Sequence, residues 1–247
     1  MLQKGADKRI YAALDGLLYR VDDSVLRLKK IRYNNINVTL PPKVRKLYEK
    51  FEREFIAELK TGVKLTAVNS AVLSGKLRQI ANGMVFDSEH LAHAVHDQKL
   101  EALVDLVEQL QGNPLLIVYE FTPDGERIAK RLKAPVVNGK VKPAERKAIL
   151  AAFNRGEQPV VICQSSVISL GANLQDACHT VAHYGLTWNL ENYIQSNRRV
   201  HRKGQKKGVI VHHIIARDTV DEVVAAVLKG KGNLQDKLCK AIIERYT

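Results

Sequence analysis

The residues Gly112-Asn-Pro114-Leu-Leu-Ile-Val-Tyr119 contain a short apolar run that follows directly on turn-forming residues. A second such run, Pro159-Val-Val-Ile-Cys163, follows a stretch with helical character at Ala144–Phe153. Short apolar runs that alternate with helices are typical of strands that are buried on both faces of a parallel sheet. These residues therefore predict an α/β fold, with a parallel sheet covered by helices on both faces.

The same alternation extends over the chain from Asp97 onward. Further strands are expected at Pro135–Asn138, His179–Tyr184 and Val209–Ile215. The helices expected between the strands are Lys99–Gln111, Gly125–Leu132, Ala144–Phe153 and Leu190–Arg202. In parallel sheets, ligands bind at the loops that follow the carboxyl ends of the strands, and we expect the functional residues there.

The first part of the chain has a different, mainly helical pattern. Pro41-Pro42 favours the start of a helix, because proline is tolerated in a first helical turn. From Lys43 to Lys60, apolar residues recur at intervals of three and four, which indicates an amphipathic helix. A second helix is expected at Leu65–Ala81, ending at Asn82-Gly83. A short strand is expected ahead of both helices, at Asn35–Leu40.

Composition restricts the class of protein. The chain of 247 residues has 39 Lys and Arg against 26 Asp and Glu, a net charge of +13, which makes a polyanion the expected partner. Aromatic residues make up only 6%, too few for extended base stacking. The apolar runs are too short to span a membrane, and Met1–Ile10 lacks the apolar core of a secretory signal. Three widely spaced cysteines suit a reducing, intracellular compartment.

The densest group of charges lies at the end of the helix expected at Leu190–Arg202. Six Lys or Arg residues and no acid occur between positions 198 and 207. Arg199 and Arg202 are three residues apart, so on a helix they share a face, and Gly204 is expected to end that helix. Two converging guanidinium groups suit a polyphosphate. The alternative is a solvated basic helix end that complements the helix dipole.

These residues resemble the motifs of a known family. The pattern Gln195-x-x-x-Arg199-x-His201-Arg202-x-Gly204-Gln205 resembles the last helicase motif of Swi/Snf-type ATPases, which are double-stranded DNA translocases of helicase superfamily two. Leu170-Gly-Ala-Asn-Leu174 resembles the fifth motif of that family, and Leu77–Asn82 resembles the helix that opens its second lobe. The resemblance runs in order over residues 20–235 and is strongest to bacteriophage and bacterial members.

Members of this family have two RecA-like lobes, with ATP in the cleft between them. The first lobe supplies the phosphate loop and the Mg²⁺-binding Asp-Glu pair, and this sequence has no Gly-x-x-x-x-Gly-Lys-Ser/Thr. The resemblance therefore implies the second lobe alone. It places a linker or the end of a preceding lobe at 1–40, a helical protrusion at 41–96, a RecA-like lobe at 97–228 and a C-terminal brace helix at 229–247.

The resemblance also assigns roles in nucleotide binding. It implies that Arg199 and Arg202 are arginine fingers and that Gly171, Gln195 and Gln205 line the nucleotide cleft. ATP and Mg²⁺ are expected only when a first lobe is joined, because arginine fingers act on a nucleotide that is already held. The chain alone is expected to bind no cofactor tightly and to hydrolyse almost no ATP.

For DNA, the resemblance places the loops of the fourth and fifth motifs along one strand of the duplex. The implied contacts are Tyr119, Phe121, Thr122, Asn138, Gly139, Gln164, Ser165, Ser166 and Trp188. A lone Trp after a strand can equally belong to the core, so both readings of Trp188 stay open. Two departures weaken the assignment: Gln164–Ser169 lacks the glycines of the family, and Glu120 puts a negative charge where the family has Gln.

Other candidate sites are weaker. His90, His93 and His96 with Asp97 have a spacing that could hold a metal, but positions three apart drift around a helix and no Cys joins them. His212 and His213 are expected on opposite faces of a strand. Asp221-Glu222 follows Thr219 in the pattern of a helix capping box, so it is not expected to bind Mg²⁺. No metal site is predicted, and the cysteines are expected to be inert buried thiols.

The leading interpretation is the second lobe of an ATP-dependent, Swi/Snf-type DNA translocase, half of an ATP hydrolase. Its expected partners are double-stranded DNA and a first lobe, on the same natural chain or on a separate protein. The expected location is the cytoplasm or nucleoid of a bacterium or a phage-infected cell. The alternatives are a non-catalytic module that binds nucleic acid or protein, and an RNA-directed helicase lobe.

Overall fold

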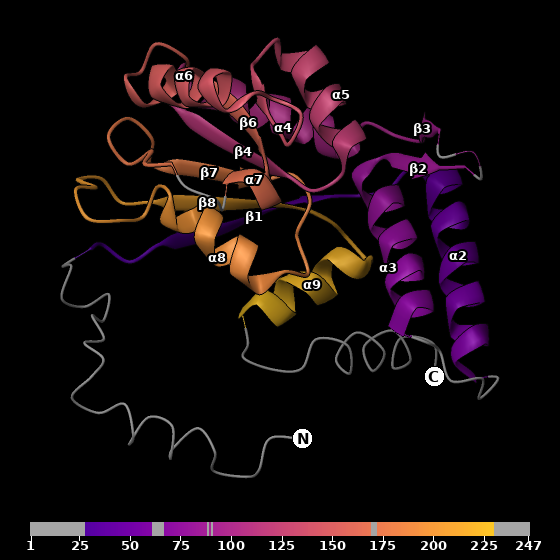
Figure 1. Cartoon of the computed structure of the whole chain (residues 1–247). Coiled ribbons are helices and arrows are strands. Elements are labelled where there is room, and N and C mark those ends of the chain that lie inside the picture. The colour runs from indigo at the N-terminus through magenta and orange to yellow at the C-terminus, as the bar shows by residue number, and fades with distance from the viewer. Residues whose placement is uncertain (1–27, 61–66, 88, 90, 169–171, 230–247) are drawn as a thin grey trace, which may run out of the picture.

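The computed structural model describes residues 28–60, 67–87, 89, 91–168 and 172–229. Its centre is a six-stranded sheet in the order β1-β8-β7-β4-β6-β5, in which all neighbouring strands are parallel (Figure 1). The strands are β1 Arg32–Val38, β4 Leu115–Tyr119, β5 Val136–Val137, β6 Val160–Gln164, β7 Thr180–His183 and β8 Ile210–Ala216. The predicted parallel α/β sheet is confirmed.

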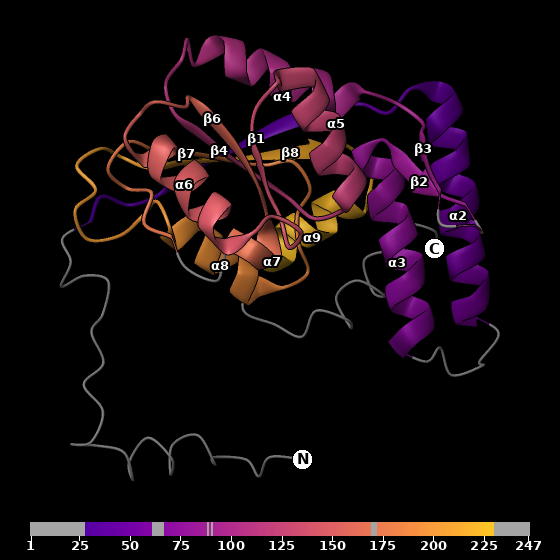
Figure 2. The ribbon, with the colours of Figure 1, turned by 45° about the horizontal axis from the view of Figure 1, so that its top comes forward.

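Helices cover both faces of this sheet (Figures 1 and 2). They are α4 Gln98–Gln109, α5 Thr122–Leu132, α6 Pro143–Asn154, α7 Ser165–Ile168 and α8 Leu190–Arg198. Alternate residues of β4 face opposite sides, as in any strand. Leu115 and Ile117 pack with α4 and α5, whereas Leu116 and Val118 pack on the other face with Phe153 of α6. This two-sided burial explains the continuous apolar run.

The expected strand at Asn35–Leu40 is present as β1, but its place in the fold differs from the expectation. Residues 1–40 were expected to be a linker or the end of a preceding lobe. Instead, β1 pairs along its whole length with β8, through bonds such as Arg32 N–H to the Val209 carbonyl at 2.9 Å. Without β1, β8 would be the edge of the sheet, and its main-chain N–H and C=O groups on that side would be unpaired. Pairing with β1 provides hydrogen-bond partners for these groups.

Two long helices stand side by side next to the sheet, α2 Pro42–Lys60 and α3 Ala67–Asn82 (Figures 1 and 2). Gly83 ends α3 as expected, with a φ of 98° that disfavours other residues. One end of the pair packs into a core with Val220 and Val224 of α9, Val220–Lys229. The Tyr48 hydroxyl accepts a hydrogen bond from the Val220 amide at 2.7 Å. This end of the expected protrusion is therefore anchored to the lobe.

The sequence pattern missed a small antiparallel hairpin after α3, formed by β2 Met84–Phe86 and β3 Ala92–Ala94. It also missed the short helix α7. Strands of three residues and a one-turn helix carry too few residues to show a period. The expected brace helix at 229–247 lies outside the described residues except for Lys229. No helix in the described ranges is both long and apolar enough to cross a membrane.

Candidate functional site

The candidate residues lie at two opposite edges of the sheet. The DNA candidates follow the carboxyl ends of β4, β5, β6 and β7, the edge where function was expected. The arginine pair lies at the other edge, in the segment between α8 and the start of β8. The DNA candidates therefore lie at the edge where ligand-binding loops were expected. The arginines lie at the opposite edge, because α8 runs back across the sheet before β8 begins.

The arginine pair is held against the segment that precedes β7. The Leu174 amide donates a hydrogen bond to the Arg199 carbonyl at 3.0 Å, and the Arg202 guanidinium donates to the Asn173 side chain. Burial lowers the pKa of Arg199, and the charge of Arg202 lowers it further, which indicates that the two cations lie close together. The structure thus brings together residues from two separate motif-like stretches.

The helix expected to carry both arginines is shorter than predicted. It ends at Arg198, and Arg199 is its C-terminal cap, so Arg202 lies beyond the helix in the following turn. Gly204, with a φ of 102°, turns the loop and does not end the helix. Arg199 and Arg202 therefore lie three residues apart in a turn that contacts residues 173–174, and they do not share a helical face.

The other nucleotide candidates differ from one another. Gln195 is half-buried on α8, one turn before Arg199, whose amide donates to the Gln195 carbonyl at 3.2 Å. The Gln205 amide group donates to the carbonyls of Cys178 at 2.8 Å, Gln175 at 3.1 Å and Val200 at 3.3 Å. The Gln205 side chain thus stabilises its own loop, and its amide group is already bonded to protein carbonyls where a nucleotide contact was expected. Gly171 lies outside the described residues.

Tyr119 was expected to contact DNA, but it belongs to the core. Its side chain is 1% exposed and packs with the cluster under α4 and α5. Gly125 makes room for the ring, since a Cβ there would lie 2.4 Å from it. Burial raises the pKa of Tyr119 to about 12. As the last residue of β4, Tyr119 points to a covered face of the sheet.

Glu120 is neutralised by a residue that the sequence did not single out. The Arg78 guanidinium lies 3.7 Å from the Glu120 carboxylate and 5.1 Å from the centre of the Phe121 ring. It also donates to the Leu186 carbonyl at 2.5 Å. Arg78 thus joins α3 to the loop after β4 and removes the unfavourable charge beside the DNA candidates. The sequence could not show this pair, because Arg78 and Glu120 lie far apart along the chain and only the fold brings them together.

The remaining DNA candidates differ in accessibility. Thr122, Gly139 and Ser166 are exposed, whereas Phe121, Asn138 and Gln164 are half-buried. Asn138 accepts the Lys140 amide at 2.9 Å and so shapes the turn that presents Gly139. Ser165 is 3% exposed at the first position of α7, so its side chain is covered and cannot make the expected contact.

Trp188 packs against the core cluster that joins α2, α3 and α9. The residue is half-buried, and its indole N–H has no hydrogen-bond partner in the described part of the chain. The packing supports the core reading of this residue.

The metal candidates that the structure describes have other partners. Among the described residues, no group of three or more His, Cys, Asp or Glu could hold a metal, and His90 lies outside them. His93 instead lies 2.6 Å from Asp87, and His96 donates to the Ile80 carbonyl at 2.8 Å. Cys163 and Cys178 are fully buried, and burial raises the pKa of both thiols.

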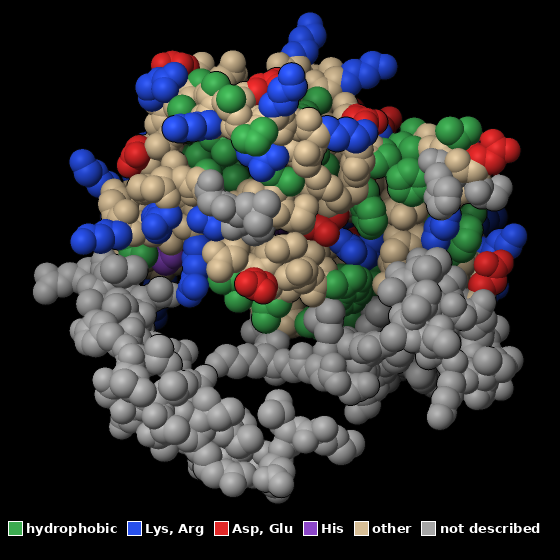
Figure 3. Space-filling model, viewed as in Figure 1, with side chains coloured by type: hydrophobic (Ala, Val, Ile, Leu, Met, Phe, Trp, Pro, Cys, Tyr) green, Lys and Arg blue, Asp and Glu red, His purple; other side chains and the backbone are tan. Residues whose placement is uncertain are grey.

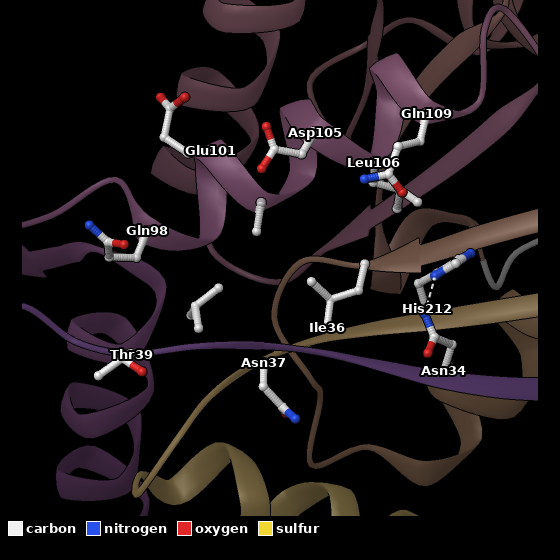
Figure 4. A pocket seen from close by; sticks show the side chains of 12 residues that line it. Asn34, Ile36, Asn37, Thr39, Gln98, Glu101, Asp105, Leu106, Gln109 and His212 are labelled. Atoms are coloured by element: carbon white, nitrogen blue, oxygen red, sulfur yellow. Dashed lines mark hydrogen bonds between the residues drawn. The ribbon is translucent and has the colours of Figure 1, made fainter.

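A pocket of about 500 Å³ lies between α4 and β1, lined by none of the nucleotide or DNA candidates (Figure 4). His212 lines it and pairs with Asn34 at 3.0 Å. His213 bonds to Tyr193 of α8 on the other face at 2.8 Å, so the predicted opposite orientation of the two histidines is confirmed. The pocket walls mix carboxylates and amides, among them Glu101 and Asp105, and do not resemble a phosphate site.

Solved structures share this architecture. The C-terminal part of the Fun30 ATPase domain aligns with a TM-score of 0.69 and 16% identity, over 89% of this chain and 98% of that one. The Sulfolobus solfataricus SWI2/SNF2 ATPase core in complex with double-stranded DNA aligns with a TM-score of 0.63 and 20% identity, over 96% of this chain and 53% of that one. These alignments establish the RecA-like fold.

Sequence comparison identifies a helicase domain. Residues 98–204 match the helicase conserved C-terminal domain. This part of the chain is a helicase C-terminal domain, and solved structures with the same fold include a SWI2/SNF2 ATPase core. The helicase lobe is 32% identical over 216 residues to putative protein p41 of Acyrthosiphon pisum secondary endosymbiont phage 1, covering 85% of this chain and 46% of that protein. It is 30% identical over 229 residues to the uncharacterized ATP-dependent helicase MG018 of Mycoplasma genitalium, covering 90% of this chain and 22% of that protein. It thus spans less than half the length of either relative.

The helicase lobe contains a buried polar cluster just inside its carboxyl edge. Lys99, fully buried, lies 2.5 Å from the Asp221 carboxylate and donates to the Asn82 side chain at 2.8 Å. Asn82 in turn donates to the Asp124 carboxylate at 2.7 Å. Asp221 therefore has a structural partner. Thr219, which was expected to open α9 in a capping box with Glu222, accepts the Asp221 amide on its hydroxyl at 3.2 Å. The cluster joins α3, α4, α5 and α9.

Asp124 is expected to make the stability of the lobe depend on pH. Burial raises the pKa of Asp124 from 3.8 to about 7, so the folded state favours the protonated carboxyl. Its contribution to stability is present below pH 4 and is lost as the pH rises toward 7. Asp124→Asn removes this titration while keeping the size of the side chain. Urea unfolding between pH 4.5 and 7.5 should show the wild type losing stability relative to the variant as the pH rises. A constant or opposite difference would contradict the assignment.

Proposed function

We propose that this helicase lobe is the second lobe of an ATP-dependent translocase on double-stranded DNA. The observation that carries the proposal is the meeting of Arg199 and Arg202 against residues 173–174, from two stretches that resemble successive helicase motifs. Residues 195–207 contain six Lys or Arg and no acid, so the pair lies in a strongly positive segment. Bringing two cations together costs electrostatic energy, which a bound anion would offset.

The residues fit the phosphates of a nucleotide that a first lobe holds. Arginine is suited to this role because its planar guanidinium donates to two phosphate oxygens at once. When ATP and Mg²⁺ are bound, they supply the reacting phosphoryl group and its counter-charge. Arg199 and Arg202 would then donate to the oxygens on which negative charge is spread. Asn173 fixes the direction of Arg202.

The DNA-binding part of the proposal concerns the carboxyl edge. Thr122, Gly139 and Ser166 are the exposed candidates there, each at the end of a different strand. Hydroxyl and main-chain N–H groups suit sequence-independent contacts to phosphate oxygens. The neutralisation of Glu120 by Arg78 favours an anion at this edge. The Sulfolobus relative in complex with double-stranded DNA has the same fold, which supports the same class of ligand.

The test joins the lobe to a first lobe. We expect the chain alone to show no ATP hydrolysis, with or without DNA. Fusion to the first lobe of the Mycoplasma genitalium helicase should give DNA-stimulated hydrolysis at least about a thousandfold above the sum of the separate parts, since an arginine finger contributes at least this much. The first lobe by itself is the matched control. Absence of stimulation in the fusion would favour a non-catalytic module, and turnover by this chain alone would contradict the proposal.

A further inference from the structure

Six exposed cations from distant parts of the sequence gather at the amino edge of the sheet. They are Lys29, Lys30, Arg32, Lys203, Lys206 and Lys207, and we call them the amino-edge basic surface. The two segments that carry them lie side by side. The His201 ring donates to the Lys29 carbonyl at 2.8 Å, and the Arg32 amide donates to the Val209 carbonyl at 2.9 Å.

The positive charge of this surface is not balanced locally. Neither residues 28–36 nor residues 198–209 contain an acid. None of the six cations forms an ion pair with another residue that the structure describes. The positive charge also acts on the residue that precedes β7, since burial and, in addition, the charge of Lys207 lower the pKa of His179. In Figure 3, Lys and Arg side chains gather at the end of the molecule where the loop before β8 lies.

The loop that carries three of these lysines is held in place. Gln205 bonds through its amide group to carbonyls of residues 175, 178 and 200, and its oxygen accepts the Lys207 amide at 2.9 Å. The main chain between Lys203 and Lys207 is therefore fixed by contacts to the body of the lobe. A fixed main chain lowers the entropy cost of presenting several charges to one ligand.

We propose that the amino-edge basic surface binds the phosphate backbone of a second segment of nucleic acid. Five of the six cations are lysines, a residue that protein interfaces avoid and that phosphate backbones attract. β8, with seven residues rising about 3.3 Å each, separates the two edges of the sheet by roughly 20 Å. Phosphates bound at this surface therefore belong to a different stretch from the one proposed for the carboxyl edge. The inference goes beyond the proposed function and does not require ATP hydrolysis.

The first test measures the salt dependence of binding to a short labelled duplex of mixed sequence, with the full chain. Replacing Lys203, Lys206 and Lys207 together by Gln should reduce the slope of log affinity against log salt by about three, one for each lost phosphate contact. The matched control replaces Lys46, Lys50 and Lys130 by Gln, which removes the same charge from exposed positions elsewhere. An equal change in both variants, or none in the first, would overturn the proposal.

The second test asks whether two duplexes bind at once. The chain, captured on an immobilised duplex, should retain a second, labelled duplex, and the Lys203/206/207 variant should lose that retention while still being captured. A chain that never holds a second duplex would overturn the proposal. The proposal would also be overturned if the Lys203/206/207 variant held both duplexes but no longer stimulated ATP hydrolysis in the fusion. The surface would then be a docking site for the first lobe. Failure of the fusion with both duplexes still bound would count against the proposed function only. Urea unfolding of each variant confirms that the fold is intact.

Discussion

Arg202→Ala is expected to lower the DNA-stimulated turnover number of the two-lobe fusion by about a thousandfold, the contribution typical of an arginine finger. The KM for ATP should change far less, because the guanidinium acts on charge that develops in the transition state. Steady-state ATP hydrolysis with saturating duplex DNA measures both quantities.

Two variants control this result. Arg202→Lys keeps the charge but loses the paired donors, so its turnover should fall between those of the wild type and the Ala variant. Arg198→Ala removes an exposed cation from the last turn of α8 and should leave turnover within about threefold of the wild type, since surface changes of this kind are small. An equal loss of turnover in Arg198→Ala and Arg202→Ala would show a general effect of positive charge, and Arg202 would then not act as an arginine finger.

Lys99→Met is expected to destabilise the lobe by about 3–5 kcal/mol, the cost of leaving one partner of a buried ion pair uncompensated. Lys99 is fully buried and Asp221 is 1% exposed, so water cannot replace the lost ammonium. The Asn82 side-chain oxygen would lose its donor as well. Urea unfolding at pH 7, followed by circular dichroism, measures the free energy of unfolding.

The double variant Lys99→Met with Asp221→Asn separates the charge from the packing. The second substitution replaces the uncompensated carboxylate by a neutral amide of similar size, so a large part of the lost stability should return. Lys147→Met, at an exposed position of α6, should change stability by less than about 0.5 kcal/mol. A loss below about 1 kcal/mol for Lys99→Met would contradict a tightly coupled buried pair.

Much of the fold was predictable because a strand that is buried on both faces has a continuous run of apolar residues in the sequence. The run Leu115–Tyr119 matches β4 in both bounds, and Asn82-Gly83 ends α3 as expected. The motif-like stretches also predicted the family. They were less reliable for individual side chains, since Tyr119 and Ser165 are buried and Gln205 bonds to its own loop. A motif specifies a segment, whereas the twist and pleat of the strand decide where each side chain points.

The sequence by itself determined the alternation of strands and helices, the absence of a phosphate loop within these 247 residues and the excess of positive charge. Only the tertiary structure decided which distant charges join the dense basic group at residues 198–207. Pairing of β1 with β8 brings Lys29 and Arg32 beside the loop that carries Lys206, although the contact between Lys29 and His201 of that loop spans 172 residues of sequence. The same holds for Arg78 beside Glu120 and for Lys99 beside Asp221. Charges interact through space, with an energy set by distance and burial, and neither quantity can be read from separation along the sequence.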